Sequence, residues 1–152
     1  MQVGLTLTQV FLTILGGAIA GGVGLLIAFC QEKRKTKKDL KTVSDEIGRN
    51  IKLVHMYMEQ VHKKDIAFFD TLQTTAFTIA NSSGALTTLP EDKRKNIYYA
   101  YDQIILYQKR EKGAKTGQAE TFAEATEENL KRAREALKST LNKSSWIFGR
   151  IL

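Results

Sequence analysis

The most constraining feature of this sequence is its N-terminal segment, in which no charged side chain occurs before Glu32. Within it, Val10 to Phe29 is a nearly unbroken apolar run of 20 residues. About 20 helical residues cross the roughly 30 Å hydrocarbon core of a bilayer. The run therefore predicts a single transmembrane helix, with residues 1–31 as a membrane anchor.

A cleaved signal peptide is the main alternative for this segment. Such a peptide has basic residues before its apolar stretch and small residues after it. Here no Lys or Arg precedes Lys33, and the apolar run is too long. The stretch ending in Cys30 also resembles a lipoprotein signal, but Phe29 stands where that processing site needs a small residue. An uncleaved anchor is the prediction.

The residues that follow the apolar run predict its orientation. Residues 32–38 form a basic flank that contains Lys33, Arg34, Lys35, Lys37 and Lys38. Basic residues next to a membrane helix stay on the cytoplasmic side. We therefore expect a protein of the cell (inner) membrane with its N-terminus outside and its remaining residues in the cytoplasm. The same cations are expected to contact anionic lipid headgroups, each contributing about 1 kcal/mol.

Five glycines lie inside the apolar run, although glycine costs roughly 1 kcal/mol against alanine in a helix interior. Small residues spaced by four allow helices to approach closely in lipid. The predicted helix-packing face consists of Gly16, Gly17, Ala20, Gly21 and Gly24. The alternative is that glycine is simply commoner in membrane helices than in soluble ones.

After the flank, apolar residues recur at helical spacing. Four helices are expected, over residues 35–63, 65–81, 90–112 and 119–143, and the first is a candidate for continuity with the membrane helix. The predicted fold class is all-α: a transmembrane helix followed by a cytoplasmic antiparallel helical bundle. The expected regions are a bundle over 39–112, a flexible linker over 113–118, a C-terminal helix over 119–145 and an apolar tail over 146–152.

Particular side chains mark these helices. The third helix is expected to bury Ile97, Tyr101, Ile104 and Ile105. Before it, Gly84 suits a helix C-terminus and Pro90 suits the first turn of the next helix. In the fourth helix, Glu127–Lys131 and Glu128–Arg132 are expected to pair one turn apart.

The first cytoplasmic helix also fits a heptad pattern. Position a holds Leu40, Ile47, Val54 and Val61, and position d holds Val43, Asn50 and Tyr57. A polar Asn in such a seam sets the register and oligomeric state of a coiled coil. The alternative, which we favour, is that this stripe packs against the later helices of its own chain.

The C-terminal tail carries large apolar side chains: Trp146, Ile147, Phe148, Ile151 and Leu152. If four helices alternate in direction, the tail returns to the membrane surface, where Trp is enriched. Contact with the membrane and contact with protein are equally good explanations.

Few residues suit catalysis. His55, Glu59 and His62 share one helix face, but no further ligands are spaced nearby, so we expect a solvated face rather than a metal site. Cys30 is a single cysteine without a neighbouring base. Five cations of the flank account for most of the net charge of +7, and no nucleic-acid motif accompanies them. We predict no enzyme activity, no cofactor, no metal, no nucleic acid and no small-molecule substrate.

Three short motifs resemble a type of small prokaryotic single-pass membrane protein without assigned function. They are an E-I-x-x-N helix at Glu46 to Asn50, an S-G-x-L-x-x-L-P turn at Ser83 to Pro90, and a Y-x-x-I helix at Tyr101 to Ile104. The likeness covers roughly residues 10 to 110. It implies the same helical architecture and no particular chemistry. Asn50 is expected to bond a neighbouring helix or the loop around Gly84.

The hypothesis from the sequence is an accessory, assembly or regulatory subunit of a membrane protein complex that acts by protein–protein contact. Its partners would be other membrane subunits, itself, or both. The alternative is a self-assembling membrane scaffold or small pore-forming protein, although the apolar segment has no charged ring for ion selectivity.

Overall fold

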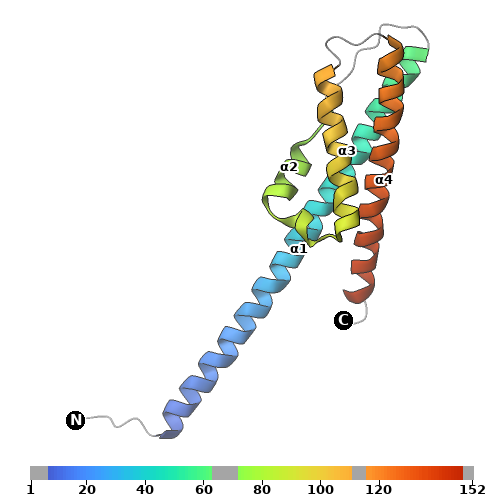
Figure 1. Cartoon of the computed structure of the whole chain (residues 1–152). Coiled ribbons are helices and arrows are strands. Elements are labelled where there is room, and N and C mark those ends of the chain that lie inside the picture. Colours follow the sequence, from blue (N-terminus) through green and yellow to red (C-terminus); the bar gives the residue numbers. More distant parts are fainter. Residues whose placement is uncertain (1–6, 63–71, 111–115, 149–152) are drawn as a thin grey trace. The chain divides into compact units, whose positions relative to one another are not determined.

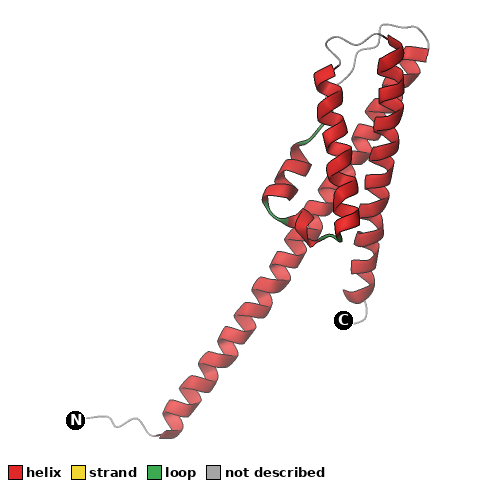
Figure 2. Ribbon diagram, viewed as in Figure 1, coloured by secondary structure: helices red, strands yellow, loops and turns green. Residues whose placement is uncertain are grey.

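The computed structural model describes residues 7–62, 72–110 and 116–148, and this part of the chain is helical and contains no strand (Figures 1 and 2). The elements in chain order are α1 (Leu7–His62), α2 (Thr75–Ser82), the 3-10 helix η1 (Ala85–Thr88), α3 (Glu91–Arg110) and α4 (Thr116–Phe148). The predicted all-α class is confirmed. The chain divides into two compact units, Met1–Lys35 and Thr36–Leu152.

Helix α1 is unbroken over 56 residues, so the apolar segment and the first cytoplasmic helix of the prediction are one helix. The large side chains of its apolar part are exposed, among them Phe11 at 65% and Leu25 at 75%. Within the described residues, this is the one segment long and apolar enough to cross a membrane. It therefore stands as a candidate membrane span.

The core of the Thr36–Leu152 unit is built on an apolar stripe of α1. Leu40, Val43, Ile47 and Val54 recur at helical spacing and are at most 5% exposed. The buried residues that join them from later in the chain are Leu72, Ala76, Ala80, Ala85, Leu86, Leu89, Ile97, Ala100, Tyr101, Ile104, Ala123, Leu130, Ala133 and Leu137. Together with Asn50, these four residues of the heptad stripe are covered by the chain's own elements, as the favoured alternative predicted, whereas Tyr57 is half-buried and the side chain of Val61 lies outside the described residues.

Helices α3 and α4 pack side by side (Figure 1). Near the start of α3, the Lys93 ammonium donates to Ser139 Oγ at 2.7 Å and to Thr140 Oγ1 at 3.1 Å, close to the end of α4. The two helices therefore run in opposite directions. Ile97 and Ile104 of α3 are fully buried, as predicted. Ile105 is 38% exposed, so the prediction that it is buried is wrong.

The turn before α3 follows its sequence signals. Gly84 has φ +74°, in the left-handed region that favours glycine, directly after the C-cap of α2. The chain then forms η1 and reaches Pro90, whose carbonyl accepts the first bond of α3 from Arg94 N–H at 2.9 Å. Glu91 and Asp92 in the first turn complement the helix dipole.

Three predicted boundaries differ from the structure. The helix expected over 65–81 begins only at Thr75 in the described residues, and 65–71 lie outside them. Helix α4 begins at Thr116, so the last part of the predicted linker is helical. Helix α4 also continues to Phe148, so Trp146, Ile147 and Phe148 end a helix rather than form a separate tail. Ile151 and Leu152 lie outside the described residues.

The burial pattern predicts which isoleucine the fold depends on. Ile47 of α1 has no exposed surface, whereas Ile79 of α2 is 56% exposed. We expect Ile47→Ala to lower the free energy of unfolding by about 2–5 kcal/mol, because it removes buried methylene groups and leaves a cavity. Urea unfolding of the full chain in mild detergent, followed by circular dichroism, measures this change. The matched control Ile79→Ala should stay within about 0.5 kcal/mol of the natural protein; equal losses would contradict the assignment of the core.

Candidate functional site

A cluster of hydrogen bonds is centred on Glu46, a carboxylate of α1 that is only 2% exposed. Its Oε2 accepts the Ala76 N–H at 2.7 Å and its Oε1 accepts the Phe77 N–H at 3.2 Å. These amides belong to the first turn of α2, where backbone N–H groups have no partner within the helix. Thr74, the N-cap residue, makes no side-chain capping bond. Glu46 therefore caps α2 from another helix.

Tyr101 of α3 completes the shell around this carboxylate. Its hydroxyl donates to Glu46 Oε1 at 2.7 Å, and its ring stacks on Phe77 with centroids 4.1 Å apart. Burial, followed by the hydrogen bond to Glu46 and the charge of Glu46, raises the pKa of Tyr101 far above its ordinary value of 10.0. The rings of Phe77 and Tyr98 also pack in a T-shaped arrangement, with centroids 5.4 Å apart. Three helices thus meet at one carboxylate.

One turn further along α1, Asn50 holds the chain just before α2. Its Oδ1 accepts the Gln73 N–H at 2.9 Å, and its Nδ2 donates to the Gln73 carbonyl at 2.8 Å. The neighbouring Leu72 carbonyl accepts a bond from Gln108 of α3 at 2.8 Å. The backbone at Leu72 and Gln73 is therefore bonded to side chains, and α2 begins only after it.

At the other end of α2, Asp39 of α1 accepts a bond from the Ser83 hydroxyl at 2.9 Å. Asp39, Glu46 and Asn50 recur at spacings of seven and four, so they lie along one side of α1. The segment from Leu72 to Ser83 is fastened to that side at three points. Asn50 was expected to bond a helix or the loop around Gly84; its partner is Gln73, and Asp39 holds the loop instead.

Sequence reasoning missed the role of Glu46. The available signal was its position: a glutamate between Val43 and Ile47, on the inward face of an amphipathic helix. A charged residue there needs hydrogen-bond donors. Both oxygens of Glu46 have such donors, from two amides and one hydroxyl. This cluster therefore acts as an anchor for α2.

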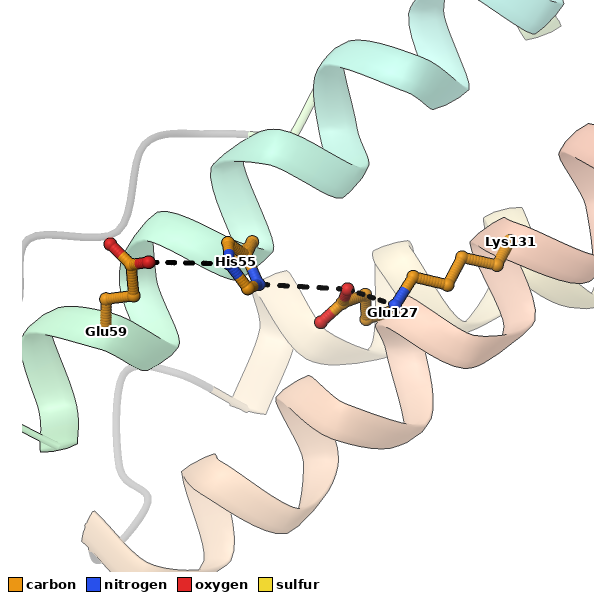
Figure 3. A network of polar contacts seen from close by, with 4 residues as sticks. All are labelled: His55, Glu59, Glu127 and Lys131. Carbon is orange, nitrogen blue, oxygen red and sulfur yellow. Dashed lines mark ion pairs between the residues drawn. The ribbon is translucent and has the colours of Figure 1, made fainter.

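A second polar network links α1 to α4 (Figure 3). His55 Nε2 lies 3.4 Å from Glu59 Oε1, and His55 Nδ1 lies 3.9 Å from Glu127 Oε1. Glu127, which is buried, also pairs with Lys131 at 2.5 Å. His55 and Glu59 are exposed, as a solvated face predicts. The side chain of His62 is outside the described residues.

Beside this network lies an open groove of about 650 Å³, lined by His55, Met58, Glu59, Glu124, Glu127, Glu128 and Lys131. In the part of the chain that the structure describes, no three His, Cys, Asp or Glu residues are arranged to hold a metal ion. The predicted pairs Glu127–Lys131 and Glu128–Arg132 are both present, each at 2.5 Å. The groove is thus lined partly by paired charges and partly by the apolar Met58 and by Glu124, which forms no ion pair in the described residues.

The glycine face of α1 is open. A Cβ atom placed on Gly16, Gly17, Gly21, Gly22 or Gly24 would meet no heavy atom within 4 Å. Ala20, between these glycines, is also exposed. The glycines therefore do not make room for another part of this chain within the described residues.

The basic flank is exposed as well. Lys33, Arg34, Lys35, Lys37 and Lys38 all have exposed side chains on α1. The Lys33 ammonium lies 4.3 Å from the centroid of the Phe29 ring, which is a cation–π contact at the end of the apolar run. Cys30, between them, is an exposed free thiol.

No protein-family model, curated protein or solved structure matches this chain. The likeness of the E-I-x-x-N and S-G-x-L-x-x-L-P motifs to small prokaryotic membrane proteins stays a prediction. Function is therefore inferred from the contacts of the chain's own residues.

The Glu46 anchor makes a stability prediction. In Glu46→Gln an amide group replaces one carboxylate oxygen, so a donor faces donors and at least one buried N–H or O–H loses its acceptor. We expect the free energy of unfolding to fall by about 1–3 kcal/mol, and by about 0.5–1.5 kcal/mol in Tyr101→Phe, which removes a single bond. Urea unfolding of the single and double variants measures both. If the two losses add without coupling, the Glu46–Tyr101 bond is contradicted.

The raised pKa of Tyr101 makes a pH prediction. The unfolded chain loses this phenol proton near pH 10, whereas the folded chain keeps it, so the stability due to this group is present below pH 10 and declines above it. The stability advantage of the natural protein over Tyr101→Phe should therefore be constant up to pH 10 and shrink at higher pH. Urea unfolding of both proteins between pH 8 and about pH 11 tests this; a constant difference would refute it.

Proposed function

We propose that this protein is a single-pass membrane subunit that acts by protein–protein contact, in an accessory, assembly or regulatory role within a larger membrane complex. In this proposal α1 crosses the cell membrane with its N-terminus outside, and the Thr36–Leu152 unit is a cytoplasmic antiparallel bundle. The observation that carries the proposal is the uncovered glycine face on an exposed apolar helix.

The physical reason lies in how helices associate in lipid. The hydrophobic effect does not hold them together there, so close approach of backbones must do so. Gly17 and Gly21, spaced by four, provide such a surface, and nothing in the described chain occupies it. A helix of another molecule is the partner that fits this face.

The burial of the heptad stripe within its own chain favours a foreign partner over a second copy of this chain. Leu40, Ile47 and Val54 are already covered by later parts of the same chain. A coiled coil between two copies would have to displace those contacts. Self-assembly through the cytoplasmic helix therefore lacks an open seam, whereas the glycine face is uncovered in the described residues.

The decisive variant is Gly17→Leu with Gly21→Leu. Two isobutyl groups on the glycine face would hold a partner helix several ångströms away and remove the close contact. We expect the double variant to lose its foreign subunits. Native mass spectrometry of the protein extracted from its host membrane in mild detergent measures this, as the loss of mass above the 17.1 kDa chain.

The matched control is Leu15→Phe with Ile19→Phe. These residues have the same spacing and lie two positions earlier, about 200° around the helix from the glycines. The control should keep the partner. If the glycine variant also keeps it, the glycine face is not the docking surface. Integer multiples of 17.1 kDa in the natural protein would instead support the self-assembling alternative.

A further inference from the structure

One cation of α4, Arg134, differs from its neighbours in having no acid beside it. Three exposed cations of this helix pair with glutamates of the same helix: Lys131 with Glu127, Arg132 with Glu128, and Lys138 with Glu135. Arg134 lies between them and is half-buried, yet it forms no ion pair with a described residue. Burial raises the cost of an unpaired charge. The most buried of these four cations is therefore the one that the chain leaves uncompensated.

The guanidinium of Arg134 rests on a glycine of α1. A Cβ atom added to Gly48 would lie 2.9 Å from Arg134 Nη2, 3.1 Å from Cζ and 3.4 Å from Nε. Gly48 is buried well inside α1, where glycine is an unfavourable residue for a helix. Unlike the five glycines of the apolar run, Gly48 makes room for another part of the chain, and that part is the charged end of Arg134.

This seat covers the guanidinium but gives it no acceptor. Arg134 Nε is buried and has no hydrogen-bond partner within the described chain. The acids of α1 closest to Gly48 in sequence are Asp45 and Glu46. Glu46 binds α2 and Tyr101, and Asp45 is exposed and forms no ion pair with Arg134. A guanidinium has five N–H donors and stays charged at any ordinary pH, so an anion from another molecule is the partner it lacks.

The charge and shape of the group indicate a carboxylate. The planar fork of a guanidinium matches the two oxygens of a carboxylate. The neighbouring cations Lys131 and Lys138 are already neutralised by glutamates, so Arg134 offers one net positive charge. One charge matches a carboxylate better than a phosphate group, which carries close to two negative charges. Arginine is also enriched at the centres of protein–protein interfaces, where it contributes strongly to binding.

We propose that Arg134, seated on Gly48, is an interface residue that binds an Asp or Glu side chain of the foreign subunit. This proposal rests on the proposed function, because that subunit is the partner assigned to the glycine face. The contact adds a polar anchor in the Thr36–Leu152 unit. It has two opposite consequences: loss of the Arg134 charge relieves the isolated chain of an unpaired cation, and it weakens the complex.

The test variant is Arg134→Met, which keeps an unbranched side chain and removes the charge. For the recombinant full chain without partner in mild detergent, we expect the urea midpoint to stay the same or rise, because an unpaired charge and an unsatisfied donor are removed. For the protein extracted from its host membrane, native mass spectrometry over a dilution series should show the apparent Kd for the foreign subunits rising by roughly tenfold or more. A lower urea midpoint would overturn the proposal, because contacts within the chain would then hold Arg134.

The matched control is Arg132→Met, which removes an exposed arginine of the same helix that already pairs with Glu128. We expect this control to keep the foreign subunits. Equal losses in Arg132→Met and Arg134→Met would overturn the proposal, because the charge of α4 alone would then explain binding. Arg134→Lys, which keeps the charge but not the fork, should retain the subunits more weakly than the natural protein.

A direct arm uses acetate as the probe for a carboxylate. In the full chain labelled with ¹⁵N, the Nε–H resonance of Arg134 is assigned by its absence in Arg134→Met. It is then followed while sodium acetate replaces sodium chloride at constant ionic strength. We expect a saturable shift at Arg134 and none at Arg132. No shift, or a larger one with inorganic phosphate, would overturn the carboxylate site.

The variants also separate the two proposals. A natural protein that carries no foreign subunit would overturn the proposed function and the Arg134 contact with it. If Gly17→Leu with Gly21→Leu releases the subunits and Arg134→Met keeps them, the Arg134 contact alone is overturned.

Discussion

The burial of one carboxylate determines how the helical unit is assembled. An ionised glutamate removed from water costs several kcal/mol unless donors replace the lost hydration. Glu46 obtains three donors, and each comes from a different place: two successive amides of α2 and the hydroxyl of α3. Since the amides are usable only in the first turn of a helix, Glu46 fixes where α2 begins. Because the Tyr101 hydroxyl must reach Oε1 of the same carboxylate, Glu46 also fixes the position of α3 against α1.

The consequences extend along α1. Asn50 and Asp39 fasten the ends of the segment that Glu46 caps at its centre. Beneath that segment, Val43 and Ile47 become fully buried, with partners from the same chain. A stripe that reads in sequence as a coiled-coil seam is therefore closed by its own chain. The polar residues determine which apolar surfaces remain available for other molecules.

The sequence predicted what depends on local periodicity and missed what depends on distant side chains. The burial of Leu40, Ile47 and Val54 in α1 and of Ile97, Tyr101 and Ile104 in α3 follows from spacing, and the turn at Gly84 follows from backbone preference; these predictions are correct. The start of α2 was wrong because Asn50, 23 residues earlier, takes both polar backbone groups of Gln73. The exposure of Ile105 shows the same limit. A helical pattern predicts which face of a helix is apolar, but how much of that face becomes buried depends on the helices packed against it. Glu46 was overlooked because its partners are 30 or more positions away.

The two parts of α1 differ in how much of their surface is covered or bonded by the rest of the chain. From Leu40 onward, Val43, Ile47 and Val54 are covered by the chain, and the buried side chains of Glu46 and Asn50 are hydrogen-bonded. Before Lys38, the apolar side chains, the glycine face and the cations all face outward. Exposed apolar surface of this extent is unfavourable in water, and a row of like charges is unfavourable in any helix. Under the proposed function, hydrocarbon would cover the apolar side chains, a partner helix would fill the glycine face, and acidic headgroups would neutralise the cations. A membrane would therefore remove the costs of the exposed apolar surface, the open glycine face and the row of like charges together. This is the strongest physical reason to propose that the N-terminal end of α1 contacts other molecules.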